Sequence, residues 1–316
     1  MNFKTFLVTC IFVTLNSFAT NPTWTTPSKV HVSAFAVNDY SQLFPNTLPT
    51  LHRTILHKNV FIDSLFAELT EHYPGKSIYV PYNYEDSSAT FLNYKSALTY
   101  NTEFVFFSGH GDQQKIFLYD HSMTVSKGCV GDSCYMYNWG KVYGGDTRWV
   151  IFDACEVLNV NKDNMLHLPL SSTSIDVAKV DTLRTAFHGV HAMLGYYSLS
   201  WEDSIPFVGG VYGSENLYKY FAEYFIEDNE TIWDSFNMAN DYLYNVFDAY
   251  YLFANNDHQM GLKPAIAFLR GYDENGYYHD TSIERFNYTF NQPIQITGTL
   301  EMFVMYDEYG TPEFYP

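Results

Sequence analysis

The stretch Phe104–Asp112, FVFFSGHGD, decides the fold. Its first four residues are apolar without interruption, which is typical of a strand buried on both faces of a parallel sheet. Polar residues and two glycines follow at once, so the strand ends there. In open parallel sheets the crevice beyond the carboxyl ends of the strands is the usual ligand site. The stretch therefore predicts an α/β fold with His110 at the functional edge of its sheet.

A second stretch, Trp149–Cys155 (WVIFDAC), has the same design. If its strand lies beside the first in a parallel sheet, His110 and Cys155 emerge at one edge and can face each other. An imidazole near a thiol lowers the pKa of the thiol or acts as its base, and the resulting thiolate attacks carbonyl carbon. The two stretches predict a Cys–His catalytic dyad. Glycine lets the backbone approach a substrate closely, so we expect the amides of Gly111 and Cys155 to bind the oxyanion.

The rest of the chain alternates strands and helices, as in β-α-β folds with parallel sheets. Apolar patterns predict further strands at Lys29–Val37, Ser77–Val80, His191–Tyr196 and Ala265–Leu269, and helices at Val60–Tyr73, Val211–Ile226 and Thr231–Phe247. The segment Gln292–Tyr306 alternates apolar and polar residues. We expect it to form a small C-terminal β appendage with the N-terminal strand.

The charge of the chain excludes most nucleic-acid binders. It carries 35 Asp+Glu against 17 Lys+Arg, a formal net charge of −18, and phosphate neutralisation requires a basic face. Disorder is excluded as well, because 47% of the residues are hydrophobic and 19% are aromatic.

The N-terminus predicts export. Lys4 precedes a mostly apolar run, and small residues around Ala19 suit a signal peptidase, so residues 1–19 are expected to be a cleaved signal peptide. The run is shorter than the roughly 20 residues that span a bilayer and contains polar residues. We expect a secreted or periplasmic protein that is not membrane-bound after cleavage.

Loss of the signal removes Cys10 and leaves three cysteines, so one thiol stays unpaired. Cys129 and Cys134 frame a short loop with two glycines, which favours a local disulfide. Cys155 is then the free thiol.

A strand ending in Ser-Gly-His-Gly at 108–111, followed by a strand ending in Asp-Ala-Cys at 153–155, resembles the caspase-like (clan CD) cysteine peptidases, which include metacaspases, gingipains, clostripain and legumain. The resemblance covers roughly Val60–Leu269. It implies a three-layer α/β/α sandwich with a mostly parallel sheet, His110 and Cys155 as the dyad, and Gly111 in the oxyanion role. Glu156 departs from many members, which have His or Gln there, and a carboxylate beside a thiol raises the pKa of the thiol.

The resemblance also implies a substrate pocket. The segment Tyr197–Ser204 falls where the family builds its S1 pocket, and it contains Trp201, Glu202 and Asp203, while Asp112 and Asp153 flank the dyad. Acidic residues in such a pocket favour cleavage after Arg or Lys by charge complementarity. The alternative is that these acids belong to a generally acidic surface.

Domain organisation follows from these segments. We expect a signal peptide at 1–19, a caspase-like α/β domain at 20–275 and a C-terminal β extension at 276–316. The polar stretch Asn159–Lys179 resembles the intersubunit loop at which some family members are processed. No metal or cofactor is expected: the acidic turn Tyr272–Gly276 could hold calcium, but it lacks the alternating oxygen ligands of a dedicated loop.

The sequence thus predicts a secreted cysteine endopeptidase whose substrate is a polypeptide, with cleavage after basic residues. The alternative is a catalytically inactive caspase-like secreted protein that binds a partner through its aromatic, acidic surface.

Overall fold

The computed structural model describes residues 29–41, 48–98, 102–120, 122–124, 147–160, 176, 178–179, 192–196, 200, 202, 204–207, 210–255, 266–272 and 297–305. The predicted signal peptide, both cysteines of the predicted disulfide (Cys129 and Cys134) and most of Asn159–Lys179 lie outside these residues. Among the described helices, none combines the length and the apolar character needed to cross a membrane.

Twelve strands and their connecting helices make up the described chain. In order they are β1 (Lys29–Ala36), α1 (Thr54–His72), β2 (Ser77–Glu85), η1 (Asp86–Ser88), α2 (Phe91–Leu98), β3 (Phe104–Ser108), β4 (Gly111–Asp112), β5 (Lys115–Phe117), β6 (Ser122–Thr124), β7 (Trp149–Asp153), β8 (Ala192–Tyr196), β9 (Ser204–Phe207), β10 (Gly210–Gly213), α4 (Asn216–Ala222), η3 (Glu223–Glu227), α5 (Ile232–Asn255), β11 (Ile266–Tyr272) and β12 (Thr297–Met305).

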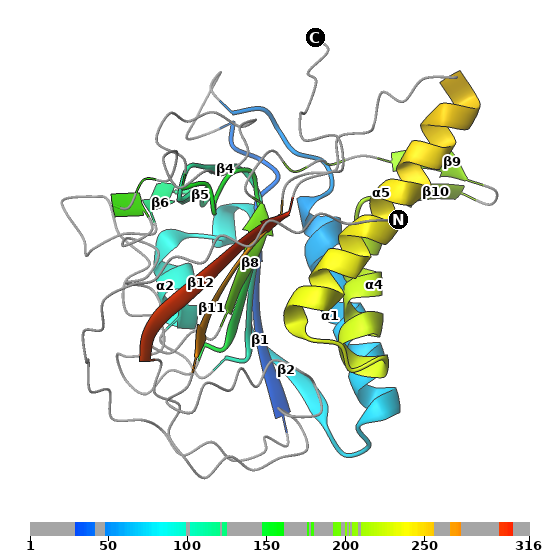
Figure 1. Cartoon of the computed structure of the whole chain (residues 1–316). Helices are drawn as coiled ribbons and strands as arrows, with labels where there is room; N and C mark the ends of the chain where they lie inside the picture. Colours follow the sequence, from blue (N-terminus) through cyan, green and yellow to red (C-terminus); the bar gives the residue numbers. More distant parts are fainter. Residues whose placement is uncertain are drawn as a thin grey trace.

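A seven-stranded sheet in the order β12-β11-β8-β7-β3-β1-β2 forms the centre of the molecule. The five strands from β8 to β2 run parallel, whereas β11 and β12 are antiparallel to their neighbours. Helices α1, α4 and α5 cover one face of the sheet and α2 lies on the other (Figure 1). The predicted α/β fold with a mostly parallel sheet between helical layers is confirmed.

Strand β3 is buried on both faces, as its unbroken apolar run predicts. On one face Phe106 stacks on Phe61 of α1 with ring centroids 4.6 Å apart. On the other face Phe107 meets Tyr94 of α2 edge to face at 6.2 Å. All five residues of β3 are buried. Helix α1 covers the sheet because Phe61, Leu65 and Leu69 recur every four residues and so share one face.

The C-terminal strand pairs differently from the expectation. Strand β12 is an edge strand that hydrogen-bonds to β11, so the predicted pairing with the N-terminal strand is wrong. The reason is that β1 already has β2 on one side and β3 on the other, which leaves it no open backbone edge. This described part of the 276–316 extension continues the central sheet.

The helix expected at Val211–Ile226 begins later than its apolar spacing suggests. Residues Gly210–Gly213 form β10, which makes a hairpin with β9, and α4 starts only at Asn216. Val211 and Tyr212 are good strand formers between two glycines, and this local preference outweighs the helical spacing. Two small sheets, β9-β10 and β4-β5-β6, thus lie beside the central one.

Replacing Phe61 should test the packing of α1 on the sheet. We expect Phe61→Ala to lower the free energy of unfolding by about 3–5 kcal/mol, because it leaves a cavity against Phe106. Urea denaturation measures the change. Phe66→Ala on the same helix is the control, since Phe66 is 50% exposed and its loss should cost about 0.5 kcal/mol or less. Equal losses in the two variants would contradict this packing.

Candidate active site

The pairing of β3 with β7 brings the two predicted catalytic residues to one edge. The strands are parallel neighbours in a register that runs from Phe104↔Trp149 to Ser108↔Asp153. His110 and Cys155 each lie two residues beyond the last pair, so both chains leave the sheet at the same level. The prediction that these strands are parallel neighbours is confirmed.

The two loops beyond the strands are in direct contact. The backbone N–H of Gly109 donates to the carbonyl oxygen of Asp153 at 3.1 Å. A Cβ atom added to Gly111 would lie 2.3 Å from the carbonyl oxygen of Cys155 and 2.8 Å from a methyl of Val157. Only glycine fits at position 111, because the cysteine loop occupies the space of a side chain.

The thiol of Cys155 is held by the segment after β8. Its Sγ lies 3.4 Å from the backbone N–H of Ser200, which donates to it, and 3.7 Å from the Ser200 carbonyl oxygen, which can accept its proton. Burial raises the pKa of the thiol; the Ser200 N–H opposes this, and the charges of Glu156 and Asp153 raise it further. In this arrangement the thiol is protonated at neutral pH.

The imidazole of His110 is held by the segment after β1. Its Nε2 lies 2.7 Å from the carbonyl oxygen of Pro49, and its backbone N–H donates to the Tyr40 hydroxyl at 3.0 Å. Because a carbonyl can only accept, Nε2 carries a proton, and in a neutral imidazole Nδ1 is then the basic nitrogen. Within the described chain, imidazole and thiol hydrogen-bond to other residues and not to each other.

Glu156 follows the cysteine in an unusual conformation. Its φ is 55°, in the left-handed region, and its side chain is half-buried. Burial and the charge of Asp112 raise the pKa of its carboxyl to about 7, although Lys179 acts in the opposite direction. Lys179 is held over the β4–β5 hairpin, where its Nζ donates to Gln113 at 3.2 Å and its carbonyl accepts from Gln114 at 2.8 Å. The end of the predicted processing segment therefore lies near the cysteine loop.

The acidic residues predicted to bind substrate differ in burial and in hydrogen-bond partners. Asp112 is half-buried, and its Oδ2 lies 3.6 Å from Nζ of Lys115. The Glu202 carboxylate accepts the backbone N–H groups of His52 at 2.8 Å and Arg53 at 3.1 Å, and so holds the backbone immediately before α1. Asp153 is 6% exposed and faces the protein interior, where it cannot contact a substrate. Trp201 and Asp203 lie outside the described residues.

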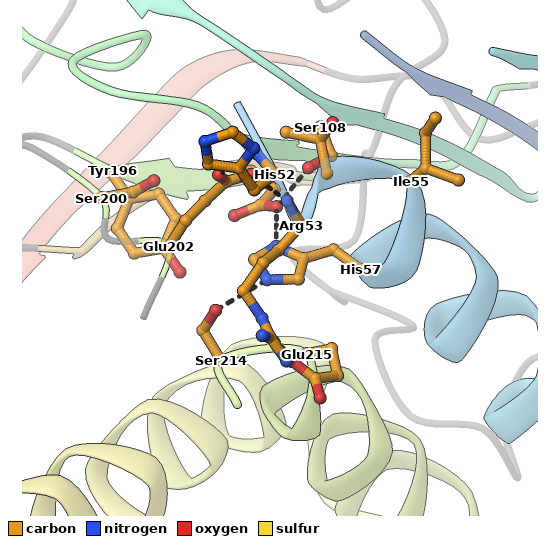
Figure 2. A network of polar contacts seen from close by, with 12 residues as sticks. His52, Arg53, Ile55, His57, Ser108, Tyr196, Ser200, Glu202, Ser214 and Glu215 are labelled. Carbon is orange, nitrogen blue, oxygen red and sulfur yellow. Dashed lines mark hydrogen bonds and ion pairs between the residues drawn. The ribbon is translucent and has the colours of Figure 1, made fainter. Parts of the chain in front are cut away.

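A buried polar network lies under the cysteine loop (Figure 2). The Nδ1 atom of His57 is 2.6 Å from Asp153 Oδ2, and its Nε2 is 2.7 Å from Ser214 Oγ. The Ser108 hydroxyl donates to the same Asp153 oxygen. Burial alone would raise the pKa of Asp153, but the charge of His57 and the hydrogen bonds from His57 and Ser108 lower it. Asp153 is thus a buried carboxylate that stays ionised.

Sequence reasoning missed this network because its members lie far apart in the chain. One signal was present: His57 falls four residues before Phe61 on the apolar face of α1, where a polar side chain needs a buried partner. The order Ser214–His57–Asp153 is that of a serine hydrolase triad. Ser214 is only 5% exposed and His57 2%, so a substrate carbonyl cannot reach the hydroxyl. In this protein the two hydrogen bonds of His57 instead connect α1 to β7 and to the residues just before α4.

The start of α1 is bound from two further sides. The Arg53 guanidinium donates through Nε to Glu215 at 3.0 Å and forms a second bond to the same carboxylate through its terminal nitrogen. Its backbone N–H is the one that Glu202 accepts. Figure 2 shows Arg53 between Glu202 and Glu215 with His57 beside it, and Ser200 on the side of Glu202. The segment that holds the thiol is therefore fixed to α1 and α4.

One group of side chains in the described residues could hold a metal ion. Single ligand atoms of Glu68, His72 and Glu227 lie within 4.8 Å of one another, near the C-terminal end of α1. His57 lies near the opposite end of that helix. The acidic turn considered for calcium, Tyr272–Gly276, lies outside the described residues after its first position.

Residues 85–280 match the model of the family described as "Domain of unknown function (DUF6345)". The chain belongs to this family. The match spans more than half of the chain and includes both motifs predicted to be catalytic, whereas β1, α1 and His57 precede it. No curated protein matches the sequence.

Three solved structures similar to this DUF6345 chain are cysteine proteinases by their titles. The Arg-specific cysteine proteinase gingipain R is 13% identical with a TM-score of 0.38, over 88% of this chain and 51% of its own. The secreted C11 protease "iotapain" of Bacteroides thetaiotaomicron is 10% identical with a TM-score of 0.37, over 77% and 67%. An inactive zymogen C11 protease of Parabacteroides distasonis is 7% identical at 0.35, over 78% and 62%. Likenesses of this size assign neither activity nor substrate.

Alkylation of Cys155 by iodoacetamide should reveal its protonation state. Because the pKa of the thiol is raised, we expect slower labelling than for a free cysteine at pH 7.5, with a rate that still increases above pH 9. Glu156→Gln removes a nearby negative charge and should speed labelling at pH 7.5 by about threefold. Peptide mapping assigns the label to Cys155. Glu71→Gln, on the exposed face of α1, is the control and should change nothing; a rate that is flat with pH would contradict the neutral thiol.

Proposed function

We propose that this protein is an exported cysteine endopeptidase in which Cys155 is the nucleophile and His110 the general acid and base. The observation that supports the proposal is the β3–β7 register, since His110 and Cys155 each follow the last paired residues, Ser108 and Asp153, by two positions in the chain. The contact of Gly111 with the Cys155 carbonyl supports it, because it presses the histidine loop against the cysteine loop. A nucleophile beside a base at the carboxyl edge of a parallel sheet suits acyl transfer.

The reaction begins from a protonated thiol. His110 leaves the Pro49 carbonyl, turns toward Cys155 and takes the thiol proton as sulfur attacks the carbonyl carbon of the substrate. The N–H groups of Gly111 and Cys155 bind the oxyanion. His110 then gives the proton to the leaving amine as the C–N bond breaks, and the acyl group remains on sulfur as a thioester. Water, deprotonated by His110, attacks the thioester and releases the acid product, and the thiol regains its proton.

The substrate proposed is a polypeptide with Arg or Lys before the scissile bond. Glu202 supports this preference, because its half-buried carboxylate lies close in the chain to Ser200, which contacts the thiol. Its charge is shared with two backbone N–H groups; Asp112 lies 3.6 Å from Lys115, and Glu156, whose pKa is raised to about 7, is only partly ionised at neutral pH. Fluorogenic peptides test the preference, and turnover only after Asp or Asn would dismiss it.

A second candidate function is that of a non-catalytic binding protein with the same fold. Three features of the site favour it: the raised pKa of the Cys155 thiol, the carboxylate of Glu156 at the next position and the bond of His110 to Pro49. Such a protein would keep the sheet and use its surface for a partner.

The proposal also includes export, a Cys129–Cys134 disulfide and processing within Asn159–Lys179. A measurement of the intact mass of the mature protein tests all three. A mature chain that starts at residue 20 and is two hydrogens lighter than its sequence supports the first two. A break within 159–179 in the active preparation supports processing, and one unbroken active chain argues against it.

Cleavage assays on single variants decide between the two functions. Cys155→Ala and His110→Ala should each reduce kcat/KM for a basic peptide by about a thousandfold or more, because each removes a member of one catalytic unit. His72→Ala is the matched control, since this exposed histidine at the end of α1 should leave the rate unchanged. Activity that survives in Cys155→Ala would overturn the peptidase proposal.

A further inference from the structure

Asp153 is the point at which the two catalytic loops and helix α1 are tied together. Its backbone carbonyl accepts the N–H of Gly109, just before His110. Its carboxylate accepts the hydroxyl of Ser108, at the end of β3, and the Nδ1 proton of His57 from α1. Cys155 follows two residues later. One residue therefore holds the histidine loop, the cysteine loop and a helix in a fixed relation.

The carboxylate of Asp153 is buried among polar side chains from three other parts of the chain. Ser108 faces it from β3, His57 from α1 and Ser214 lies behind His57 at the start of α4. Tyr218 of α4 packs its ring on His57 at 5.7 Å, and its hydroxyl and that of Tyr196 on β8 lie within electrostatic reach. Cys155 and Glu156 are the titratable groups of the same loop. A buried charge is weakly screened, so Asp153 acts on its neighbours more strongly than a surface acid does.

We propose that Asp153 and His57 form a positioning pair for Cys155, which fixes the cysteine loop against the histidine loop and places a buried negative charge two residues before the thiol. His57 and Ser108 hold that charge in place. The catalytic consequence rests on the proposed function, whereas the effect on the thiol does not. Neither residue touches the reacting atoms, so both act through Cys155.

Asp153→Asn is the decisive variant, because it removes the charge and keeps the shape. We expect the pH midpoint of Cys155 alkylation to fall and the rate at pH 7.5 to increase about twofold to threefold. Ser214→Ala is the matched control: it removes a partner from the other side of His57 but leaves the Asp153 charge intact. Its midpoint should equal that of the wild type. An unchanged midpoint in Asp153→Asn would overturn the proposal. An equal fall of the midpoint in Asp153→Asn and Ser214→Ala would overturn it as well, because loosened packing would then expose the thiol in both variants without any effect of the Asp153 charge.

If Asp153→Asn does not fold, Ser108→Ala provides an alternative test of the Asp153 charge. It removes a hydroxyl donor from the carboxylate, leaves the charge less compensated and should slow alkylation by about twofold, opposite to the effect of loosening. Faster alkylation in Ser108→Ala would contradict the proposal.

Peptide cleavage supplies a separate measurement for the catalytic part. In Asp153→Asn, kcat should fall about tenfold with KM unchanged, because an uncharged amide binds His57 and Ser108 more weakly than a carboxylate and so holds the dyad less firmly, while substrate binding stays intact. If no form of the protein cleaves peptides, the proposed function fails while the alkylation midpoints still decide the role of the pair.

Discussion

The parallel pairing of β3 with β7 is the constraint on which the rest of the structure depends. Its register is fixed because both strands are buried on both faces, so a slip by one residue would exchange every aromatic contact on the two sides. Helix α1 packs on one side of this pair through Phe61, and α2 packs on the other through Tyr94. The position of the site is thus a consequence of core packing.

An ionised carboxylate in such a core is costly unless donors surround it. Asp153 ends β7 on the face that α1 covers, and this explains why α1 carries a histidine on its apolar side. The same helix is held at its start by Glu202 and, through Arg53, by Glu215. These buried and half-buried polar groups thus lie beneath the cysteine loop, and each hydrogen-bonds to another member of the group.

The central sheet could be predicted from sequence because its signal is local. The runs Phe104–Phe107 and Trp149–Phe152 are apolar without a break, and few structures other than a buried parallel strand accept such runs. The place of the C-terminal strand could not be predicted, since which strand edge remains open depends on the whole topology. His57 was missed for a related reason: its partner is 96 residues away, and helical spacing shows which face a residue shares but not what lies opposite. The orientation of His110 toward Pro49 depends on a hydrogen bond that no motif encodes.

The β3–β7 register also determines in which segments members of the family can differ in chain length. His110 and Cys155 owe their common level to strands that end together, while some forty residues join the one strand to the other. Insertions or deletions in that connection leave the strand ends where they are. One residue added inside β3 would instead turn its side chains to the opposite face and carry the histidine out of step with the cysteine. Divergence among members is therefore expected to collect between the motifs, and the spacing within each motif to stay constant.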